Sequence, residues 1–188
     1  MPSININFLN KLKVSYKDYN NFIETGTFMG ETIFEMEKYF DKLYTIEIKE
    51  EYYNNLIEKY KGNKINFKLG SSEKVLKEIL SNIRGKSIFF LDGHWSAGTT
   101  GKGEKDVPLY EEITNIKNLH NEECIIIVDD VRMFGKGPNK KGKKKDICNW
   151  ENINVKSILK IINERLEKYY YLSSNLDKND RLVIHVKK

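Results

Sequence analysis

The most constraining feature of this sequence is the stretch Asn21-Phe-Ile-Glu-Thr-Gly-Thr-Phe-Met-Gly-Glu-Thr-Ile33. Its short apolar run ends at the carboxylate of Glu24, two glycines follow at Gly26 and Gly30, and helical spacing begins after them. Because glycine lacks a Cβ atom, the backbone there can turn sharply and approach a ligand closely. A strand that leads through a glycine-rich turn into a helix predicts the nucleoside cradle of an α/β protein.

The rest of the chain alternates between apolar runs and helical patterns. Continuous apolar runs suit parallel strands that are covered on both faces. We predict five strand–helix units followed by an antiparallel C-terminal hairpin. Together they form a doubly wound, Rossmann-like α/β sheet of seven strands, mostly parallel, with helices on both faces. The first expected strand begins at Phe22, and the other six span 43–48, 65–69, 87–91, 124–128, 169–172 and 181–186. The expected helices span 29–40, 50–60, 72–80, 108–119 and 152–166.

The length of 188 residues fits one domain, so we expect a single unit over residues 1–188. Residues 1–19 are expected to be a lead-in with one helical turn. The loop 132–150 is longer than most loops in such folds and is expected to be a substrate lid. No apolar run reaches the ~18 residues of a membrane span, and the N-terminus lacks a signal peptide's apolar segment. We therefore expect a cytoplasmic protein that does not enter a membrane.

Acidic residues follow four of the predicted strands. They are Glu24, Glu47, Asp92 and the pair Asp129-Asp130. In open α/β sheets, ligands bind outside the carboxyl ends of the strands, where the strand order reverses. We therefore expect these carboxylates to line one crevice.

The opening turn does not match the dinucleotide fingerprint, which requires a third glycine between Gly26 and Gly30. Glu24 and Glu31 would also flank the place of a pyrophosphate, where like charges repel. An NAD-dependent oxidoreductase is therefore disfavoured. A cationic ligand without phosphate fits better, and S-adenosylmethionine carries both an ammonium and a sulfonium group.

With Glu47 and the complete strand–helix order, the motif Glu24-Thr-Gly-Thr-Phe-Met-Gly30 resembles class I S-adenosylmethionine-dependent methyltransferases. The resemblance runs from about residue 20 to the end. It implies that Glu24 and Gly26 border the methionine part, that Glu47 holds the ribose and that Gly70-Ser71-Ser72 lies near the adenine. The expected cofactor-binding residues are Glu24, Thr25, Gly26, Thr27, Gly30, Glu47, Ser71, Ser72, Asp92 and Trp95.

The three aspartates Asp92, Asp129 and Asp130 resemble the metal site of macrocin-type sugar O-methyltransferases. That resemblance implies Mg²⁺ or another divalent cation, which prefers oxygen ligands and lowers the pKa of a bound hydroxyl group. The expected catalytic residues are Asp92, His94 and Asp129. Two alternatives stay open for the aspartate pair, because Asp129 and Asp130 could instead cap the following loop, or one of them could act as a base without metal.

His94 and Trp95 also have two interpretations each. His94 is either a general base, since imidazole titrates near ~6.5, or a loop histidine bonded to the backbone or to the cofactor. Trp95 either stacks on the adenine or covers the edge of the core.

The expected acceptor is a small molecule or glycan. The lysines of 136–145 suggest an anionic one. Nucleic acid is disfavoured because aromatic and basic residues are not interleaved, although a ribose 2′-hydroxyl remains an alternative acceptor. A non-catalytic binding module that keeps the cofactor fold is the other alternative. A homodimer is expected only from the resemblance.

Overall fold

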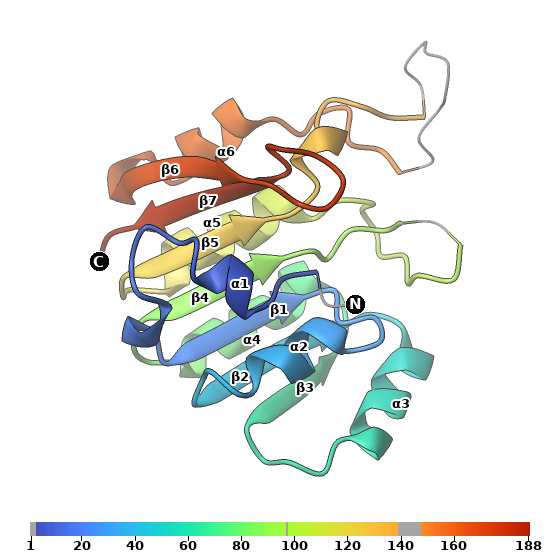
Figure 1. Ribbon diagram of the computed structural model, residues 1–188. Helices are drawn as coiled ribbons and strands as arrows, with labels where there is room; N and C mark the ends of the chain where they lie inside the picture. Colours follow the sequence, from blue (N-terminus) through green and yellow to red (C-terminus); the bar gives the residue numbers. More distant parts are fainter. Residues whose placement is uncertain (1–2, 97, 139–147) are drawn as a thin grey trace.

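The computed structural model describes residues 3–96, 98–138 and 148–188. In this part of the chain, seven strands form one sheet in the order β3-β2-β1-β4-β5-β7-β6 (Figure 1). Strands β1 to β5 run parallel, and β7 is antiparallel to both β5 and β6. The predicted sheet and its terminal hairpin are thus confirmed. The strands are β1 (Asn21–Thr25), β2 (Lys42–Glu47), β3 (Ile65–Leu69), β4 (Ser87–Leu91), β5 (Cys124–Val128), β6 (Leu166–Leu172) and β7 (Arg181–Val186).

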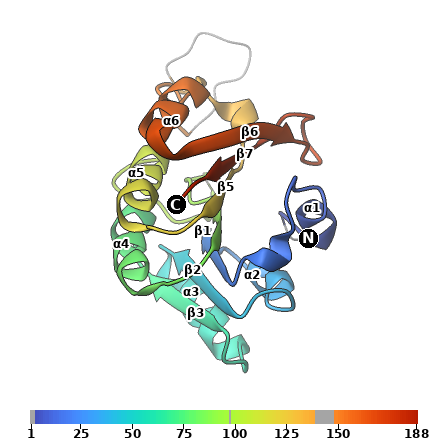
Figure 2. The same ribbon diagram turned by 90° about the vertical axis from the view of Figure 1, so that its left-hand side faces the viewer.

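Helices cover both faces of the sheet, as predicted (Figure 2). Helices α4, α5 and α6 lie on one face and α1 and α2 on the other, while α3 packs against β3 and β2. The α-helices are α1 (Ile6–Leu9), α2 (Glu31–Met36), α3 (Glu50–Lys59), α4 (Ser72–Asn82), α5 (Leu109–Leu119) and α6 (Val155–Ile161), and the short 3₁₀ turns are η1 (Tyr16–Asp18), η2 (Val131–Met133) and η3 (Asn163–Arg165). None of the helices in the described ranges has the length and apolar character needed to cross a bilayer.

The core forms two layers because successive side chains of a strand point to opposite faces. Ile23 and Phe89 belong to the layer under α4, α5 and α6. Their sequence neighbours Phe22 and Phe90 belong to the layer under α1 and α2. All four side chains are completely buried. Burial on both faces explains why the strands are continuous apolar runs in the sequence.

Two helices are shorter than the sequence predicted. Helix α2 begins only at Glu31, because Gly30 precedes it in the left-handed conformation at φ 79°. The predicted helix over 152–166 is confined to α6 and the 3₁₀ turn η3, because Asn154 caps the helix start and β6 begins at Leu166. The Asn154 side chain accepts a hydrogen bond from the backbone N–H of Ser157 at 2.9 Å.

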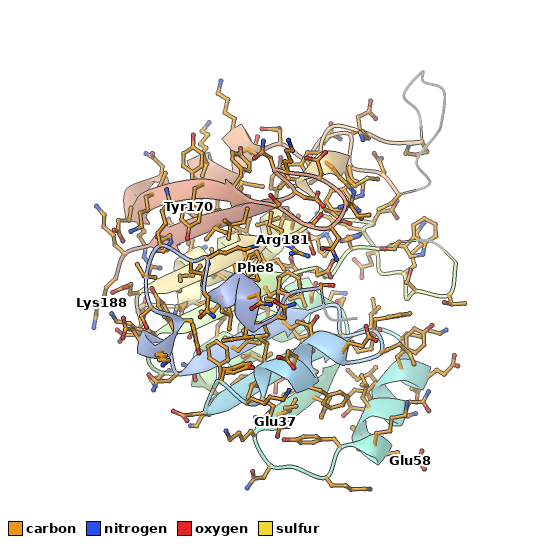
Figure 3. The ribbon with its side chains drawn as sticks, in the orientation of Figure 1. Phe8, Glu37, Glu58, Tyr170, Arg181 and Lys188 are labelled. Carbon is orange, nitrogen blue, oxygen red and sulfur yellow. The ribbon has the colours of Figure 1, made fainter. Side chains whose placement is uncertain are left out.

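The lead-in is joined to the C-terminal hairpin. It contains α1 and η1, where one helical turn was predicted. The guanidinium of Arg181, at the start of β7, lies 5.2 Å from the ring centre of Phe8 in α1. It also donates a hydrogen bond to the carbonyl of Ser3. Figure 3 shows Arg181 and Phe8 side by side.

Candidate active site

The site is organised around the place where the backbones after β1 and β4 touch. The strand order reverses between these two strands, which is where open α/β sheets bind ligands. Gly26 has φ 83°, and a Cβ on it would lie 2.4 Å from the carbonyl oxygen of Asp92. The backbone N–H of Gly26 donates to the carbonyl of Ile46 at 3.0 Å. Only glycine therefore allows the turn after β1 to cross the end of β4.

Glu24 is the buried acidic residue at this crossing. Its side chain is 2% exposed and accepts a hydrogen bond from the hydroxyl of Thr45 at 2.8 Å. The Thr45 hydroxyl also contacts that of Thr27 at 2.6 Å. Burial raises the pKa of Glu24 well above its ordinary value, and the nearby charges of Asp92 and Glu47 raise it further. A bound cation would favour the charged form of this carboxyl group.

Glu47 ends β2, as the sequence predicted, and braces the glycine turn. One of its carboxylate oxygens accepts from the backbone N–H of Phe28 at 2.8 Å and the other from that of Lys49 at 2.8 Å. Phe28 has a positive φ of 50°, which is unusual for a bulky residue. The Glu47 carboxylate therefore holds the turn in this conformation while facing the cavity.

A cavity of about 330 Å³ opens over this end of the sheet. A volume near ~300 Å³ is at the lower end of typical small-ligand pockets. Most of the predicted cofactor residues line this one cavity. They are Glu24, Gly26, Thr27, Glu47, Ser71, Ser72, Asp92 and Trp95, and His94 lines it with them.

Two predicted cofactor residues support the cavity from outside its lining. Thr25 is fully buried, and its hydroxyl accepts a hydrogen bond from the backbone N–H of Gly93 at 3.2 Å. A Cβ on Gly30 would lie 2.5 Å from the side chain of Leu56. Thr25 thus fixes the loop after β4, and Gly30 permits the close packing of α2 on α3.

His94 connects two of the predicted aspartates. Its Nε2 lies 2.9 Å from a carboxylate oxygen of Asp130, and its Nδ1 lies 3.5 Å from one of Asp92. Burial opposes the charged imidazole, but the hydrogen bond to Asp130 and the charge of Asp92 leave the pKa of His94 raised. The hydrogen bond from His94 helps to keep the pKa of Asp130 low despite its burial.

Asp92 is the acid of this cluster that faces the cavity. Its side chain is 24% exposed, and desolvation raises its pKa, with Asp129 and Asp130 adding to the rise. His94 works in the opposite direction. Asp92 is therefore a carboxyl group of increased proton affinity beside an imidazole that is already held by Asp130.

The structure separates the two neighbouring aspartates. Asp129 lies 3.2 Å from the Arg181 guanidinium, whereas Asp130, at a left-handed φ of 61°, pairs with Arg132 and His94. Arg132 also pairs with the fully buried Asp180. The left-handed turn at Asp130 thus sends the two carboxylates to different partners.

The predicted metal triplet does not come together as one group. In the described ranges, the acidic and histidine groups whose ligand atoms lie within 4.8 Å of one another are Asp92, His94 and Asp130, and separately Asp129, Asp130 and Asp180. In this structure Asp129 is not grouped with Asp92 and Asp130, because it turns toward Arg181, and the three-aspartate metal site stays a prediction. His94 takes its place beside Asp92 and Asp130.

Two tryptophans border the cluster. Lys102 places its Nζ 4.0 Å from the ring centre of Trp95, which lines the cavity. Trp150 is 2% exposed, and its ring centre lies 4.7 Å from that of His94. Trp150 could not be predicted from the sequence, because a tryptophan at the end of a long loop carries no sequence signal for a contact with His94.

The predicted lid loop is described only at its two ends. The backbone N–H of Gly135 donates to the carbonyl of Trp150 at 3.0 Å, and that of Trp150 donates to the carbonyl of Lys136 at 2.8 Å. These bonds close the base of the loop beside the cluster. The lysines at 140, 141 and 143–145 lie outside the described residues.

Comparison with known proteins found no matching protein-family model and no matching curated protein, whereas solved structures do match. A candidate S-adenosylmethionine-dependent methyltransferase from Listeria monocytogenes has 12% identity and a TM-score of 0.59, with 97% of each chain covered. The N-methyltransferase NodS from Bradyrhizobium japonicum WM9 has 10% identity and a TM-score of 0.51, over 90% of this chain and 85% of that one. This chain has the class I methyltransferase fold.

A third solved structure with this fold is a fibrillarin/Nop5p complex. It has 16% identity and a TM-score of 0.58, over 97% of this chain and 78% of the other. Identities this low show the methyltransferase fold and leave the acceptor open. The closer resemblance to sugar O-methyltransferases stays a prediction.

Proposed function

We propose that this protein is an S-adenosylmethionine-dependent O-methyltransferase that acts on a hydroxyl group of a sugar, glycan or other small molecule. The observation that carries the proposal is the cluster of Asp92, His94 and Asp130, of which Asp92 and His94 line the cavity formed by the methyltransferase-fold loops. The cluster thus places a carboxylate that can accept a proton beside the cavity in which we expect the methyl donor to bind.

The charge of the cavity supports a cationic donor. Glu24, Glu47 and Asp92 all line it, and the pKa of each is raised, with desolvation as the largest cause. A ligand that carries an ammonium and a sulfonium group stabilises these carboxylates in their ionised form. A pyrophosphate would instead face the same three carboxyl groups at close range. This favours S-adenosylmethionine over a dinucleotide.

We assign the role of general base to Asp92. The acceptor hydroxyl oxygen attacks the methyl carbon, the carbon–sulfur bond breaks, and its electron pair stays on sulfur as a neutral thioether. The hydroxyl proton passes to Asp92, whose raised pKa makes it a stronger base than an ordinary aspartate. His94 is held by Asp130 and places its Nδ1 3.5 Å from this carboxylate, which limits the movement of Asp92. Alignment of oxygen, carbon and sulfur supplies much of the remaining rate enhancement.

A divalent metal ion is a second way for the same cluster to act. Asp92, His94 and Asp130 offer two carboxylates and an imidazole within 4.8 Å, a donor set that fits an ion such as Mn²⁺ or Mg²⁺. These residues would hold the ion, which would supply Lewis acidity toward the acceptor hydroxyl. Arg132 pairs with Asp130 and Arg181 pairs with Asp129. The two guanidinium groups therefore neutralise part of the negative charge of the acidic cluster.

The proposal is tested by calorimetry and by one variant. We expect S-adenosylmethionine and S-adenosylhomocysteine to bind and NAD not to bind. In a screen of hydroxylated acceptors, Asp92→Asn should lower kcat by at least about 100-fold and leave the Kd for S-adenosylhomocysteine within about threefold, because loss of a general base typically costs ~10²–10⁴-fold. Glu58→Gln, on the exposed part of α3, is the matched control (Figure 3).

Failure of both adenosyl ligands to bind would refute the cofactor assignment. Binding without turnover on any acceptor would favour the non-catalytic binding module instead. Turnover on a ribose 2′-hydroxyl of RNA, and not on sugars or small alcohols, would move the acceptor to nucleic acid. An anionic acceptor and a homodimer remain predictions, as the lysines that suggested the first lie outside the described residues.

A further inference from the structure

Glu112 is a buried carboxyl group directly beneath the proposed catalytic loop. It lies on α5 and is 2% exposed. Its Oε1 has no hydrogen-bond partner among the described residues. Buried polar atoms in native proteins are nearly always paired, so an unpaired carboxyl oxygen here calls for a physical reason.

The carboxyl group touches three segments that shape the cavity. A Cβ on Gly93 would lie 3.1 Å from Glu112 Oε1 and 2.9 Å from the Thr25 hydroxyl, so the backbone at Gly93 passes directly over both groups. Hydrogen bonding from the hydroxyls of Ser72 and Thr25 acts on Glu112 and lowers its pKa, against the larger effect of burial. Glu112 therefore joins the end of β1, the start of α4 and the loop after β4.

A second, small cavity also borders Gly93. Its volume is about 10 Å³, and Glu112, Gly93, His94, Asp129 and Trp150 are among the residues that line it. A volume of roughly 10–15 Å³ holds one water molecule, provided that polar groups surround it. The lining of this cavity is mainly apolar, so it does not meet that condition, and the direct approach of Glu112 to Gly93 is what links the carboxyl group to the loop.

We propose that Glu112 is a positioning residue, which acts through its close approach to Gly93 to hold Asp92 and His94 in place. Thr25 completes the support, because its hydroxyl already accepts from the Gly93 N–H. The catalytic consequence rests on the proposed function of Asp92.

The test compares two replacements of similar size. Glu112→Gln keeps a hydrogen-bonding group of the same shape, whereas Glu112→Leu removes it. The chain has three histidines, so imidazole NMR signals at one fixed pH report on His94 at the site and on His120 and His185 elsewhere. We expect the leucine variant to shift only the His94 signal and the glutamine variant to leave all three in place.

The kinetic measurement compares the same two variants, and the leucine variant should again be the more strongly affected. Misplacement of reacting groups by ~1 Å costs on the order of 100-fold in rate. We therefore expect kcat to fall by about that factor in Glu112→Leu with an unchanged KM for S-adenosylmethionine, and the glutamine variant to stay within about threefold of the wild type. The NMR measurement needs no turnover. If the wild type is inactive and the leucine variant still shifts only the His94 signal, the proposed function is refuted and the positioning role stands.

Thr25→Val provides a second probe if the leucine variant does not fold. It removes the hydroxyl between Gly93 and Glu112 and should shift the His94 signal selectively as well. His120 caps the same helix as Glu112 and therefore reports on α5 itself. An unmoved His94 signal in both variants, or equal shifts at all three histidines, would overturn the positioning role.

Discussion

The burial of Glu112 has a measurable effect on stability against pH. Burial raises the pKa of this carboxyl group from an ordinary 4.5 to about 7 in the folded protein. Between these values the folded chain keeps a proton that the unfolded chain has released, so the free energy of unfolding falls as pH rises. A difference of about 2.5 pKa units corresponds to roughly 3 kcal/mol at about 1.4 kcal/mol per unit. Glutamine cannot ionise, so Glu112→Gln should lose this component.

The measurement is urea unfolding of the wild type and of Glu112→Gln from about pH 5 to pH 8. The variant should gain stability relative to the wild type as pH rises, by about 2–3 kcal/mol over this interval. Comparing the two proteins cancels the parallel contributions of Glu24 and Asp92, which both also have raised pKa values. Glu58→Gln, an exposed change, should give a flat difference. A flat difference for Glu112→Gln as well would show that the carboxyl group is ionised in the folded state.

Two further predictions concern the glycine turn after β1 and the candidate metal ligands. Gly26→Ala should abolish binding of S-adenosylhomocysteine, measured by calorimetry, because its Cβ would lie 2.4 Å from the Asp92 carbonyl; retained binding would show that the crossing of β1 and β4 can relax. If the wild type binds Mn²⁺, Asp130→Asn should weaken that binding by at least about tenfold and Asp129→Asn should not, because only Asp130 shares a group with Asp92 and His94. If Asp129→Asn weakens Mn²⁺ binding and Asp130→Asn does not, the result would favour a metal site that includes Asp129. If the wild type binds no ion, Asp92 would act as a base without metal.

The sheet could be predicted from the sequence because its strands are buried on both faces. Such strands are apolar on both faces at most positions, and the runs at Ser87–Leu91 and Cys124–Val128 have few polar interruptions. The carboxylates at the strand ends could be predicted because each follows an apolar run directly, although Glu24, Glu47 and Asp129 are themselves buried. Strand order then brought Glu24 and Asp92 to one crossing.

The connections inside the site could not be predicted from the sequence. Asp129 and Asp130 are adjacent and chemically identical, and only the left-handed backbone at Asp130 separates their partners. Glu111 and Glu112 are likewise adjacent on α5, yet Glu111 pairs with Lys105 near the surface while Glu112 is buried. Neighbouring residues of a helix point in different directions, so one glutamate faces the surface and the next faces the core. The charge pattern of the sequence does not show which of the two is buried.

The pairing of Asp129 with Arg181 has a consequence for a chain that is still being synthesised. Strand β5 is made more than 50 residues before its neighbour β7, because Asp129 and Arg181 are separated by 52 positions. At typical synthesis rates of ~5–20 residues per second, several seconds pass before Arg181 emerges. During that time the Asp129 carboxylate has no guanidinium partner, and the Ser3 carbonyl lacks the donor that joins the first residues to the sheet. The carboxyl end of the parallel strands therefore closes last, when the hairpin arrives.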